Sequence, residues 1–261
     1  MLELKNANGG YGKRTVVSDV SVKFPEGEIT SVIGANGCGK STLLMLCAGL
    51  LVPTSGQVIL DGEDMAKLPR NEAAKRISYL GQIKNSGSIT VRSLVSHGRF
   101  PYLGYPRRYT AADREKINEA MELAGVADIA ERNVSELSGG QQQRAHIAMT
   151  LAQDTKTILL DEPLAYLDIN RQFELMELIV RLKSLGKTVI TVMHDLNLAL
   201  IYSDKIAVME KGAVTAFDTP ENIIRSNAIE TALGVKAEYC PESKQYFFSI
   251  KHYTNNHLTY G

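Results

Sequence analysis

Tryptophan is absent from this chain, and cysteine is scarce. The cysteines among its 261 residues are Cys38, Cys47 and Cys240. Three cysteines cannot all pair, and their spacing does not match the CxxC pattern of a zinc site. We therefore expect neither a disulfide framework nor a structural zinc site. This cysteine usage is typical of proteins in a reducing compartment.

Neither sign of charge is in excess. The chain has 29 Lys plus Arg and 29 Asp plus Glu, which gives a formal net charge of +0 at pH 7. Proteins that hold nucleic acid through its phosphates carry a clear basic excess. We therefore expect no nucleic-acid partner.

Long apolar runs are also missing. No run approaches the roughly 18 residues that a membrane-spanning helix requires. The first residues, Met1-Leu2-Glu3-Leu4, do not have the layout of a signal peptide. We expect a cytosolic chain that forms one large or two small domains.

Residues 34–42 read Gly-Ala-Asn-Gly-Cys-Gly-Lys-Ser-Thr and match the phosphate-loop pattern G-x-x-x-x-G-K-[ST]. The apolar run at 29–33 predicts a buried strand before the loop, and leucines after it predict a helix. Glycine-rich backbone N–H groups, the positive end of that helix and a lysine together suit a triphosphate, and a serine hydroxyl can bind Mg²⁺. The positions expected to bind nucleotide are Gly34, Asn36, Gly37, Cys38, Gly39, Lys40, Ser41 and Thr42.

Two adjacent acids follow a second apolar strand at 157–160. With the phosphate loop upstream, we expect Asp161 to hold the water shell of Mg²⁺ and Glu162 to polarise the water that attacks the γ-phosphate. A third strand at 188–193 brings His194 to the same edge, where it is expected to contact the γ-phosphate. Such strand–helix–strand alternation predicts an α/β fold with a parallel sheet, whose nucleotide lies at the carboxyl ends of the strands.

Two positions have more than one interpretation. Tyr11, between Gly10 and Gly12, could stack on an adenine ring or could be an ordinary aromatic residue of a surface turn. Gln82 follows a strand at 77–81 and could reach Mg²⁺ or the attacking water, or could simply belong to a loop.

The segment 85–154 is helical in pattern, which predicts an inserted helical subdomain. Within it, residues 137–144 read Leu-Ser-Gly-Gly-Gln-Gln-Gln-Arg, a second glycine-containing loop that opens a helix and forms another anion site. Because one nucleotide needs one phosphate cradle, we expect this loop to serve a nucleotide held by a different subunit. The loop residues at the start of this helix are Ser138, Gly139, Gly140 and Gln141.

The remaining segments complete the predicted organisation. Alternating residues in 1–24 predict half-buried antiparallel strands, residues 206–214 predict a hairpin at the sheet edge, and one short helix is expected beyond Pro220. The predicted division is a nucleotide-binding core at 1–84 and 155–238, a helical subdomain at 85–154, and a tail at 239–261 with no assigned role.

In order and spacing, these motifs resemble those of the ATP-binding subunits of ABC transporters, and the resemblance covers nearly the whole chain. Its most specific part is Leu-Ser-Gly-Gly-Gln. The resemblance implies an α/β P-loop NTPase (RecA-like) core with an antiparallel β layer and an inserted α-helical subdomain. The motifs that carry it are Tyr11, the phosphate loop, Gln82, residues 137–141, Asp161–Glu162, Leu167–Asp168 and His194.

The resemblance further implies that two copies, most simply a homodimer, close head-to-tail on two ATP molecules with Mg²⁺. The implied roles are γ-phosphate contacts to the partner's ATP for Ser138, Gly140 and Gln141, general base for Glu162, switch for His194, and dimer-loop acid for Asp168. Gln82 is one of the motif residues that carry the resemblance, and we expect it to contact Mg²⁺ or the attacking water.

The sequence departs from the family pattern at three places. Ala35 and Cys38 lie in the phosphate loop, where binding works through backbone N–H groups, so we expect nucleotide binding to remain intact. Leu164-Ala165-Tyr166 replaces a loop that usually contains Thr or Ser, at the place where the dimer interface is expected.

Within the family, residues 98–104, 167–172 and 194–199 look like those of importers of ferric siderophores, haem and cobalamin. This implies an ATPase on the cytoplasmic face of the membrane that powers a separate permease and, indirectly, an external binding protein. Ferric siderophore is the expected cargo, with haem or cobalamin as alternatives. A soluble ABC ATPase acting on ribosomes or DNA is a competing interpretation, but the chain has neither a second cassette nor a long coiled coil. A phosphate-loop kinase or other NTPase is disfavoured by the Leu-Ser-Gly-Gly-Gln loop.

The groove between the core and the helical subdomain is bordered by Gln82 and the segment that follows it to about Tyr105, and this aromatic and basic segment is expected to receive a short helix of a multi-spanning permease. Aromatic anchors with a charged rim are typical of protein interfaces. The residues concerned are Arg99, Phe100, Tyr102, Tyr105, Arg107 and Arg108.

Overall fold

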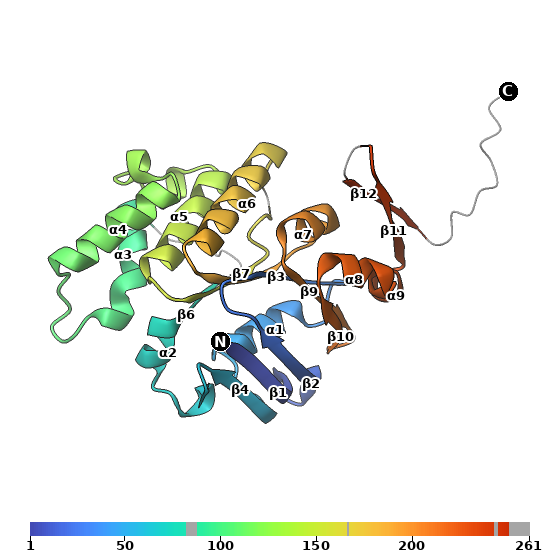
Figure 1. Cartoon of the computed structure of the whole chain (residues 1–261). Coiled ribbons are helices and arrows are strands. Elements are labelled where there is room, and N and C mark those ends of the chain that lie inside the picture. The colour runs from blue at the N-terminus through green and yellow to red at the C-terminus, as the bar shows by residue number, and fades with distance from the viewer. Residues whose placement is uncertain (82–87, 166, 243–244, 251–261) are drawn as a thin grey trace.

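The computed structural model describes residues 1–81, 88–165, 167–242 and 245–250, and within these ranges the chain forms an α/β fold around a 6-stranded sheet (Figure 1). Its strands are, in sheet order, β10 (Ala213–Asp218), β9 (Lys205–Glu210), β3 (Ile29–Gly34), β8 (Thr188–Val192), β7 (Thr157–Asp161) and β6 (Ile77–Leu80). Neighbouring strands from β9 to β6 are parallel, and β10 pairs antiparallel at the edge. The predicted parallel sheet and edge hairpin are both confirmed.

The central strands are apolar because both faces of the sheet are covered. Every residue of β3, β7 and β8 is buried. Successive side chains of a strand point to opposite faces, so Val32 belongs to one hydrophobic cluster and the adjacent Ile33 to another.

The cluster on the Val32 side lies between two sheets. The helix α1 (Lys40–Cys47) packs here, with the parallel sheet on one side of it and a 4-stranded antiparallel sheet on the other, as Figure 1 shows for the described residues. The strands of the second sheet are, in order, β2 (Arg14–Phe24), β1 (Leu2–Tyr11), β4 (Ser55–Leu60) and β5 (Glu63–Asp64). The antiparallel layer predicted from the alternating pattern is therefore confirmed.

The cluster on the Ile33 side is covered by helices that follow the strands. They are α6 (Ile169–Ser184), α7 (Leu196–Tyr202), α8 (Pro220–Arg225) and α9 (Ala228–Leu233). One short helix was expected beyond Pro220, but two form, because Asn227 adopts a left-handed φ of 56° between them and interrupts the helix.

A third hydrophobic cluster belongs to the inserted helical segment. Its elements are α3 (Val91–Ser96), the 3-10 helices η2 (His97–Tyr102), η3 (Ala127–Ile129) and η4 (Val134–Glu136), α4 (Ala111–Leu123) and α5 (Gly139–Ala152). In the chain the segment lies between β6 and β7, and α2 (Arg70–Arg76), which follows η1 (Met65–Lys67) and precedes β6, packs against η2. Having its own cluster, the segment forms a distinct part of the fold beside the parallel sheet (Figure 1).

At the C-terminal end, β11 (Val235–Cys240) and β12 (Gln245–Ile250) form an antiparallel hairpin. The predicted boundary at residue 239 falls inside β11, so the start of the segment expected to be a tail is part of this hairpin. Within the described ranges, no helix is both long and apolar enough to cross a bilayer.

Candidate active site

The phosphate loop connects β3 to α1. Gly37 and Gly39 adopt positive φ angles of 77° and 109°, which side chains with a Cβ rarely tolerate. Gly39 is the N-cap of α1, and no side chain in the described ranges caps that end. The first N–H groups of a helix have no partner within it. Those of α1 are therefore available to an anion.

Lys40 and Cys38 contribute to this loop in different ways. The Lys40 side chain is buried, and its Nζ donates to the backbone oxygens of Gly34 (2.8 Å) and Ala35 (3.1 Å). An ammonium has three donors, so one is left for another acceptor. The Cys38 side chain belongs to the hydrophobic cluster on the Val32 side, so its backbone is what it offers to a ligand.

Asp161, at the end of β7, accepts two hydrogen bonds. Ser41 Oγ donates to Oδ1 (3.0 Å), and Tyr79 Oη donates to Oδ2 (3.1 Å). Tyr79 lies on β6, the strand next to β7, which explains how it reaches the acid. Ser41 was predicted to bind Mg²⁺ and Asp161 to hold its water shell, whereas Tyr79 was expected only as part of a strand.

Burial raises the pKa of Asp161 above its ordinary value, although the hydrogen bonds from Ser41 and Tyr79 lower it, and Glu162 raises it further. A buried carboxylate beside a second acid is stabilised by a cation. Asp161 and the Ser41 hydroxyl are oxygen ligands of the kind Mg²⁺ prefers, and Mg²⁺ keeps several waters and phosphate oxygens as its other ligands. The donor set therefore fits Mg²⁺ bound together with a nucleotide.

Glu162 and His194 meet at the edge of the sheet. Glu162 Oε1 lies 2.8 Å from His194 Nε2. The two residues follow β7 and β8, whose last residues, Asp161 and Val192, are aligned in register. Glu162 has a φ of 53°, a conformation that persists where the surroundings hold it. The predicted convergence of these side chains beside Asp161 is therefore present in the structure.

The second glycine-containing loop begins α5. Ser138 is its N-cap, and Ser138 and Gln141 form a capping box: Ser138 Oγ accepts from Gln141 N (3.4 Å), and Gln141 Oε1 accepts from Ser138 N (3.2 Å). Gly139 and Gly140 form the first turn of the helix. Within one chain these side chains therefore stabilise the helix start.

Gln143, two residues further along α5, was not predicted as a site residue. It is buried, and its Nε2 donates to the Pro163 backbone oxygen at 2.8 Å. Pro163 directly follows Glu162, so the helix that begins with the Leu-Ser-Gly-Gly-Gln loop is bonded to the turn that carries the second acid. The pair is 20 residues apart in sequence, and no local pattern signals it.

The other predicted site residues are separate from this cluster. Asp168 is the N-cap of α6, and its Oδ1 accepts from Arg171 N at 3.0 Å. Tyr11 is 51% exposed at the end of β1, where its hydroxyl contacts Met45 Sδ at 3.3 Å. Gln82 lies outside the described residues.

One expectation about the aromatic segment is wrong. Arg99 was expected in an exposed charged rim, but it is 7% exposed and pairs with Asp113, because that carboxylate and a backbone oxygen satisfy its guanidinium. Tyr102 and Tyr105 are exposed as expected, and Arg107 is exposed with its Cζ 4.9 Å from the centre of the Phe100 ring.

Comparisons with known proteins agree with this geometry. Residues 17–165 match a family model whose description is ABC transporter. The chain is 42% identical over 229 residues to the ferric enterobactin transport ATP-binding protein FepC of Escherichia coli (strain K12), an alignment that covers 87% of this chain and 84% of that protein.

A second relative and a solved structure extend the comparison. The iron(3+)-hydroxamate import ATP-binding protein FhuC of Bacillus subtilis (strain 168) is 40% identical over 231 residues, which cover 88% of this chain and 86% of that protein. A dimeric bacterial ABC transporter cassette superposes with a TM-score of 0.74 at 31% identity, covering 84% of this chain and 99% of that one.

Proposed function

This chain belongs to the ABC transporter family, and we propose that it is the ATP-hydrolysing subunit of an importer that brings a ferric siderophore into the cell through a separate membrane permease. The observation that carries the ATPase is the cluster of Ser41, Asp161, Glu162 and His194 beside the phosphate loop. The similarity to a ferric enterobactin transport protein and to an iron(3+)-hydroxamate import protein, over most of their length, supports the cargo.

In this proposal the phosphate loop holds the triphosphate. The free donor of Lys40 and the N–H groups at the start of α1 bind its oxygens, and Thr42 contacts an inner phosphate. Tyr11, half exposed at the end of β1, stacks on the adenine ring. The full set of loop contacts is Gly34, Asn36, Gly37, Cys38, Gly39, Lys40, Ser41 and Thr42.

Mg²⁺, when bound, supplies positive charge to the outer phosphates. Ser41 would ligate it directly, Asp161 would orient its waters, and Tyr79 would hold Asp161 in place. Gln82, which lies outside the described residues, is proposed as a further ligand.

Hydrolysis would use the pair of Glu162 and His194. Glu162 accepts the proton of the attacking water, and His194 donates to the γ-phosphate. His194 Nε2 lies 2.8 Å from Glu162 Oε1. If His194 instead donates to a phosphate oxygen, the Glu162 carboxylate is free to accept from the attacking water. The pair would thereby act as a switch that responds to the γ-phosphate.

A second copy of the chain would complete each site, as in the dimeric cassette that this fold resembles. Gly139 and Gly140 would present N–H groups, together with the side chains of Ser138 and Gln141, to the partner's γ-phosphate. Asp168 would lie at the dimer contact.

We further propose that 1–84 and 155–238 act as the nucleotide-binding core and that 85–154 is the helical subdomain that carries the signature loop, Leu-Ser-Gly-Gly-Gln at 137–141. The permease would engage the exposed aromatic residues Phe100, Tyr102 and Tyr105. The chain would then lie peripherally on the cytoplasmic face, with an external binding protein delivering cargo to the permease.

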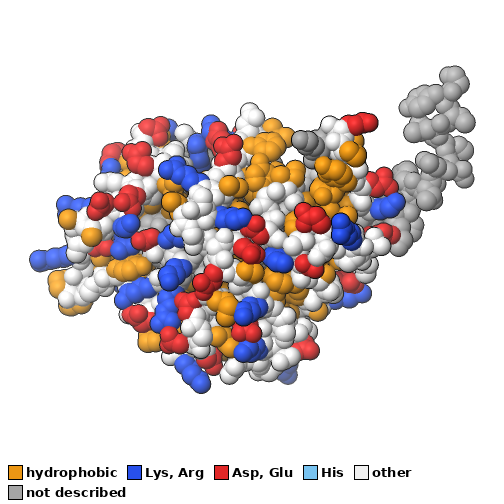
Figure 2. Space-filling model, in the orientation of Figure 1, with side chains coloured by type: hydrophobic (Ala, Val, Ile, Leu, Met, Phe, Trp, Pro, Cys, Tyr) orange, Lys and Arg blue, Asp and Glu red, His pale blue; other side chains and the backbone are white. Residues whose placement is uncertain are grey.

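We propose no nucleic-acid partner. On the face drawn in Figure 2, acidic and basic side chains are interspersed, without a one-signed patch, in keeping with the net charge of +0. Copurification with a membrane permease supports the importer, whereas copurification with ribosomes would support the competing interpretation.

Replacing Tyr79 by Phe removes the hydroxyl that donates to Asp161. We expect the Mg²⁺ concentration needed for half-maximal ATP binding to rise about fivefold, since one hydrogen bond is worth about 1 kcal/mol. Titrating Mg²⁺ against a fluorescent ATP analogue measures this. Tyr239→Phe, at an exposed tyrosine of β11, is the matched control. An unchanged Mg²⁺ requirement in Tyr79→Phe contradicts the proposed role of the hydroxyl.

Deleting the gene should abolish growth on at least one ferric siderophore supplied as sole iron source, because the permease would have no ATPase. Growth on a panel of ferric siderophores, haem and cobalamin measures the cargo, with the strain restored by the wild-type gene as control. Unimpaired growth on every compound would reject the cargo and leave the ATPase untouched.

A further inference from the structure

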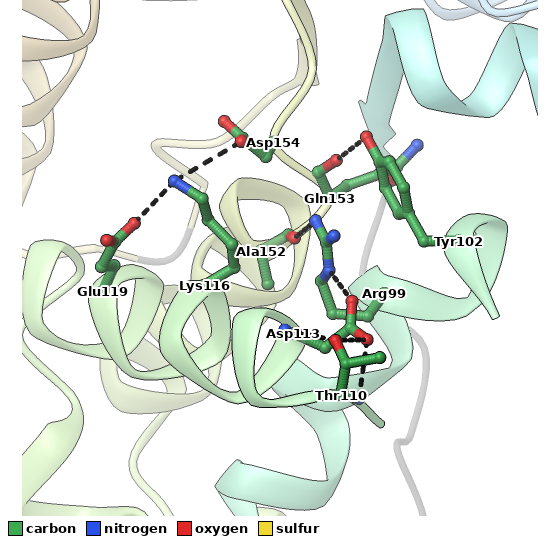
Figure 3. Close-up of polar contacts among 9 residues, drawn as sticks. All are labelled: Arg99, Tyr102, Thr110, Asp113, Lys116, Glu119, Ala152, Gln153 and Asp154. Carbon is green, nitrogen blue, oxygen red and sulfur yellow. Dashed lines mark hydrogen bonds and ion pairs between the residues drawn. The ribbon is translucent and has the colours of Figure 1, made fainter. Parts of the chain in front are cut away.

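We propose that Arg99 and Tyr102 clamp the C-terminal end of the signature helix α5 to the exposed aromatic segment η2, and so act as positioning residues that pass movement of a bound permease to the signature loop. This inference rests on the proposed importer function. It assigns a coupling role to two side chains whose contacts are internal to the chain (Figure 3).

Arg99 joins three elements. Its Nη1 donates to the backbone oxygen of Ala152 at the end of α5 (3.0 Å), and its Nε donates to Asp113 Oδ1 in the first turn of α4 (3.0 Å). Asp113 is held in turn by the capping box of α4, which it forms with Thr110. A guanidinium at the carboxyl end of a helix also complements the helix dipole. Arg99 therefore fixes η2 to two helices at once.

Tyr102 adds a second bond at the same helix end. Its hydroxyl donates to the backbone oxygen of Gln153 (2.9 Å), and its ring stacks 3.9 Å from the Arg99 Cζ. Figure 3 shows both side chains reaching the last turn of α5 from η2. Tyr102 is 37% exposed, so one residue both holds α5 and faces a partner.

The backbones meet at the same place. A Cβ added to Gly98 would lie 2.2 Å from the Met149 backbone oxygen and 3.0 Å from Ala152 Cβ. At Gly98, therefore, no side chain separates η2 from the last turn of α5. A displacement of η2 is transmitted to the helix by direct contact, since packed interiors resist compression.

The same end of α5 is bonded to the core. The Gln153 amide donates to the backbone oxygens of Ala74 and of Ile77 (3.1 Å), at the junction of α2 and β6. Asp154 pairs with Lys187, just before β8 (2.9 Å), and with Lys116 of α4 (3.6 Å). The C-terminal end of α5 is thus where η2, α4 and the core converge.

The signature loop lies at the opposite end of this helix. With 14 residues, α5 is about 21 Å long and behaves as a rod. A small rotation of α5 about its anchored C-terminal end moves Ser138–Gln141 by a larger distance than it moves the residues at that anchored end. The helix also bonds to Pro163 through Gln143, so the rotation reaches the turn that carries Glu162. Binding of the permease at η2 is therefore linked both to the Ser138–Gln141 loop and to the turn that carries Glu162.

The test compares Tyr102→Phe with Tyr239→Phe in the full chain. The first variant deletes the bond to Gln153 and keeps the ring, and the second makes the same change at an exposed tyrosine of β11, outside the proposed permease contact. In Tyr102→Phe we expect amide exchange in the last turn of α5 to quicken about fivefold, the factor that corresponds to one hydrogen bond. Uptake of radiolabelled ferric siderophore per ATP hydrolysed should fall by a similar factor, while the ATPase rate of the isolated subunit stays at the wild-type level.

Three results overturn the clamp. They are unchanged exchange in α5, unchanged uptake per ATP, and an ATPase of the isolated subunit that falls in parallel with uptake, which indicates a merely structural role. If the wild-type chain restores no uptake of the ferric siderophore, the proposed cargo is wrong. The clamp is then tested on the complex of the chain with its permease, copurified from membranes. Its ATPase stimulation over the isolated subunit must then be lost in Tyr102→Phe, and retained stimulation overturns the clamp.

Discussion

Replacing Glu162 by Gln is expected to lower the ATPase rate by at least about a hundredfold, because a general base contributes about 10²- to 10⁴-fold to such a reaction. The amide keeps the shape of the side chain and its contact with His194, so ATP binding should persist. Phosphate release measures the rate, and a fluorescent ATP analogue measures binding. Glu177→Gln, at an exposed glutamate of α6, is the control.

The Glu162→Gln variant, which should still bind ATP, is also expected to accumulate as an ATP-bound dimer. With hydrolysis blocked, the γ-phosphate stays available to the partner's signature loop, which size-exclusion chromatography with MgATP detects as a shift from monomer to dimer. Wild-type hydrolysis by Glu162→Gln would show that another residue is the base.

Lys40→Ala should behave differently, because it removes a charge from the triphosphate cradle. A hydrogen bond between charged groups is worth about 1.5–3 kcal/mol, so the dissociation constant for ATP should rise about ten- to hundredfold. The carboxylates of Asp161 and Glu162 are unchanged, so the defect should appear in ATP binding. Lys67→Ala, at an exposed lysine of η1, controls for loss of charge. Tight ATP binding by Lys40→Ala would remove the lysine from the cradle.

The parts of the site that the sequence predicts are those whose chemistry is contained in consecutive residues. The phosphate loop, the acids after β7 and the histidine after β8 each follow an apolar run that forms a buried strand. Because carboxyl ends of parallel strands share one edge, convergence of Asp161, Glu162 and His194 follows from topology alone.

The parts that the sequence does not predict are contacts between distant residues. Tyr79 and Asp161 are 82 positions apart, because the inserted helical segment lies between β6 and β7 in the sequence. They meet because β6 and β7 are adjacent strands of the sheet. A tyrosine in a strand has no local feature that distinguishes a buried hydrogen-bond donor from an ordinary core aromatic. Its role becomes visible only when the strand order is known.

Arg99 shows that the burial of a charged side chain is equally hard to predict from the sequence. A basic residue in an aromatic, loop-like stretch suggests a solvent-exposed rim, since buried arginines are rare unless they are paired. The partners that permit its burial lie on two other helices, at Asp113 and Ala152. A pattern of neighbouring residues cannot reveal them.

A further prediction concerns the stability of the ion pair between Arg99 and Asp113. The Arg99 and Asp113 side chains are 9% and 7% exposed, so Arg99→Met leaves a buried carboxylate without its cation. Breaking a buried pair by removing one partner costs about 3–5 kcal/mol. We expect the free energy of unfolding in urea at pH 7 to fall by about that amount. Arg92→Met, which removes the exposed pair with Glu131, should cost less than about 1 kcal/mol.

The pH dependence of the effect follows from Asp113. Burial raises its pKa, but hydrogen bonds from Thr110 and Arg99 lower it more, so the pKa lies below the ordinary value of 3.8. A lowered pKa in the folded state contributes stability above pH 3.8 that is lost as the pH falls through the folded value. In Arg99→Met this contribution shrinks, and the variant should lose less stability than wild type between pH 5 and acid, as urea unfolding at several pH values measures. An equal loss in both proteins, or a cost at pH 7 no larger than that of Arg92→Met, would show that the pair does not hold the helical segment together.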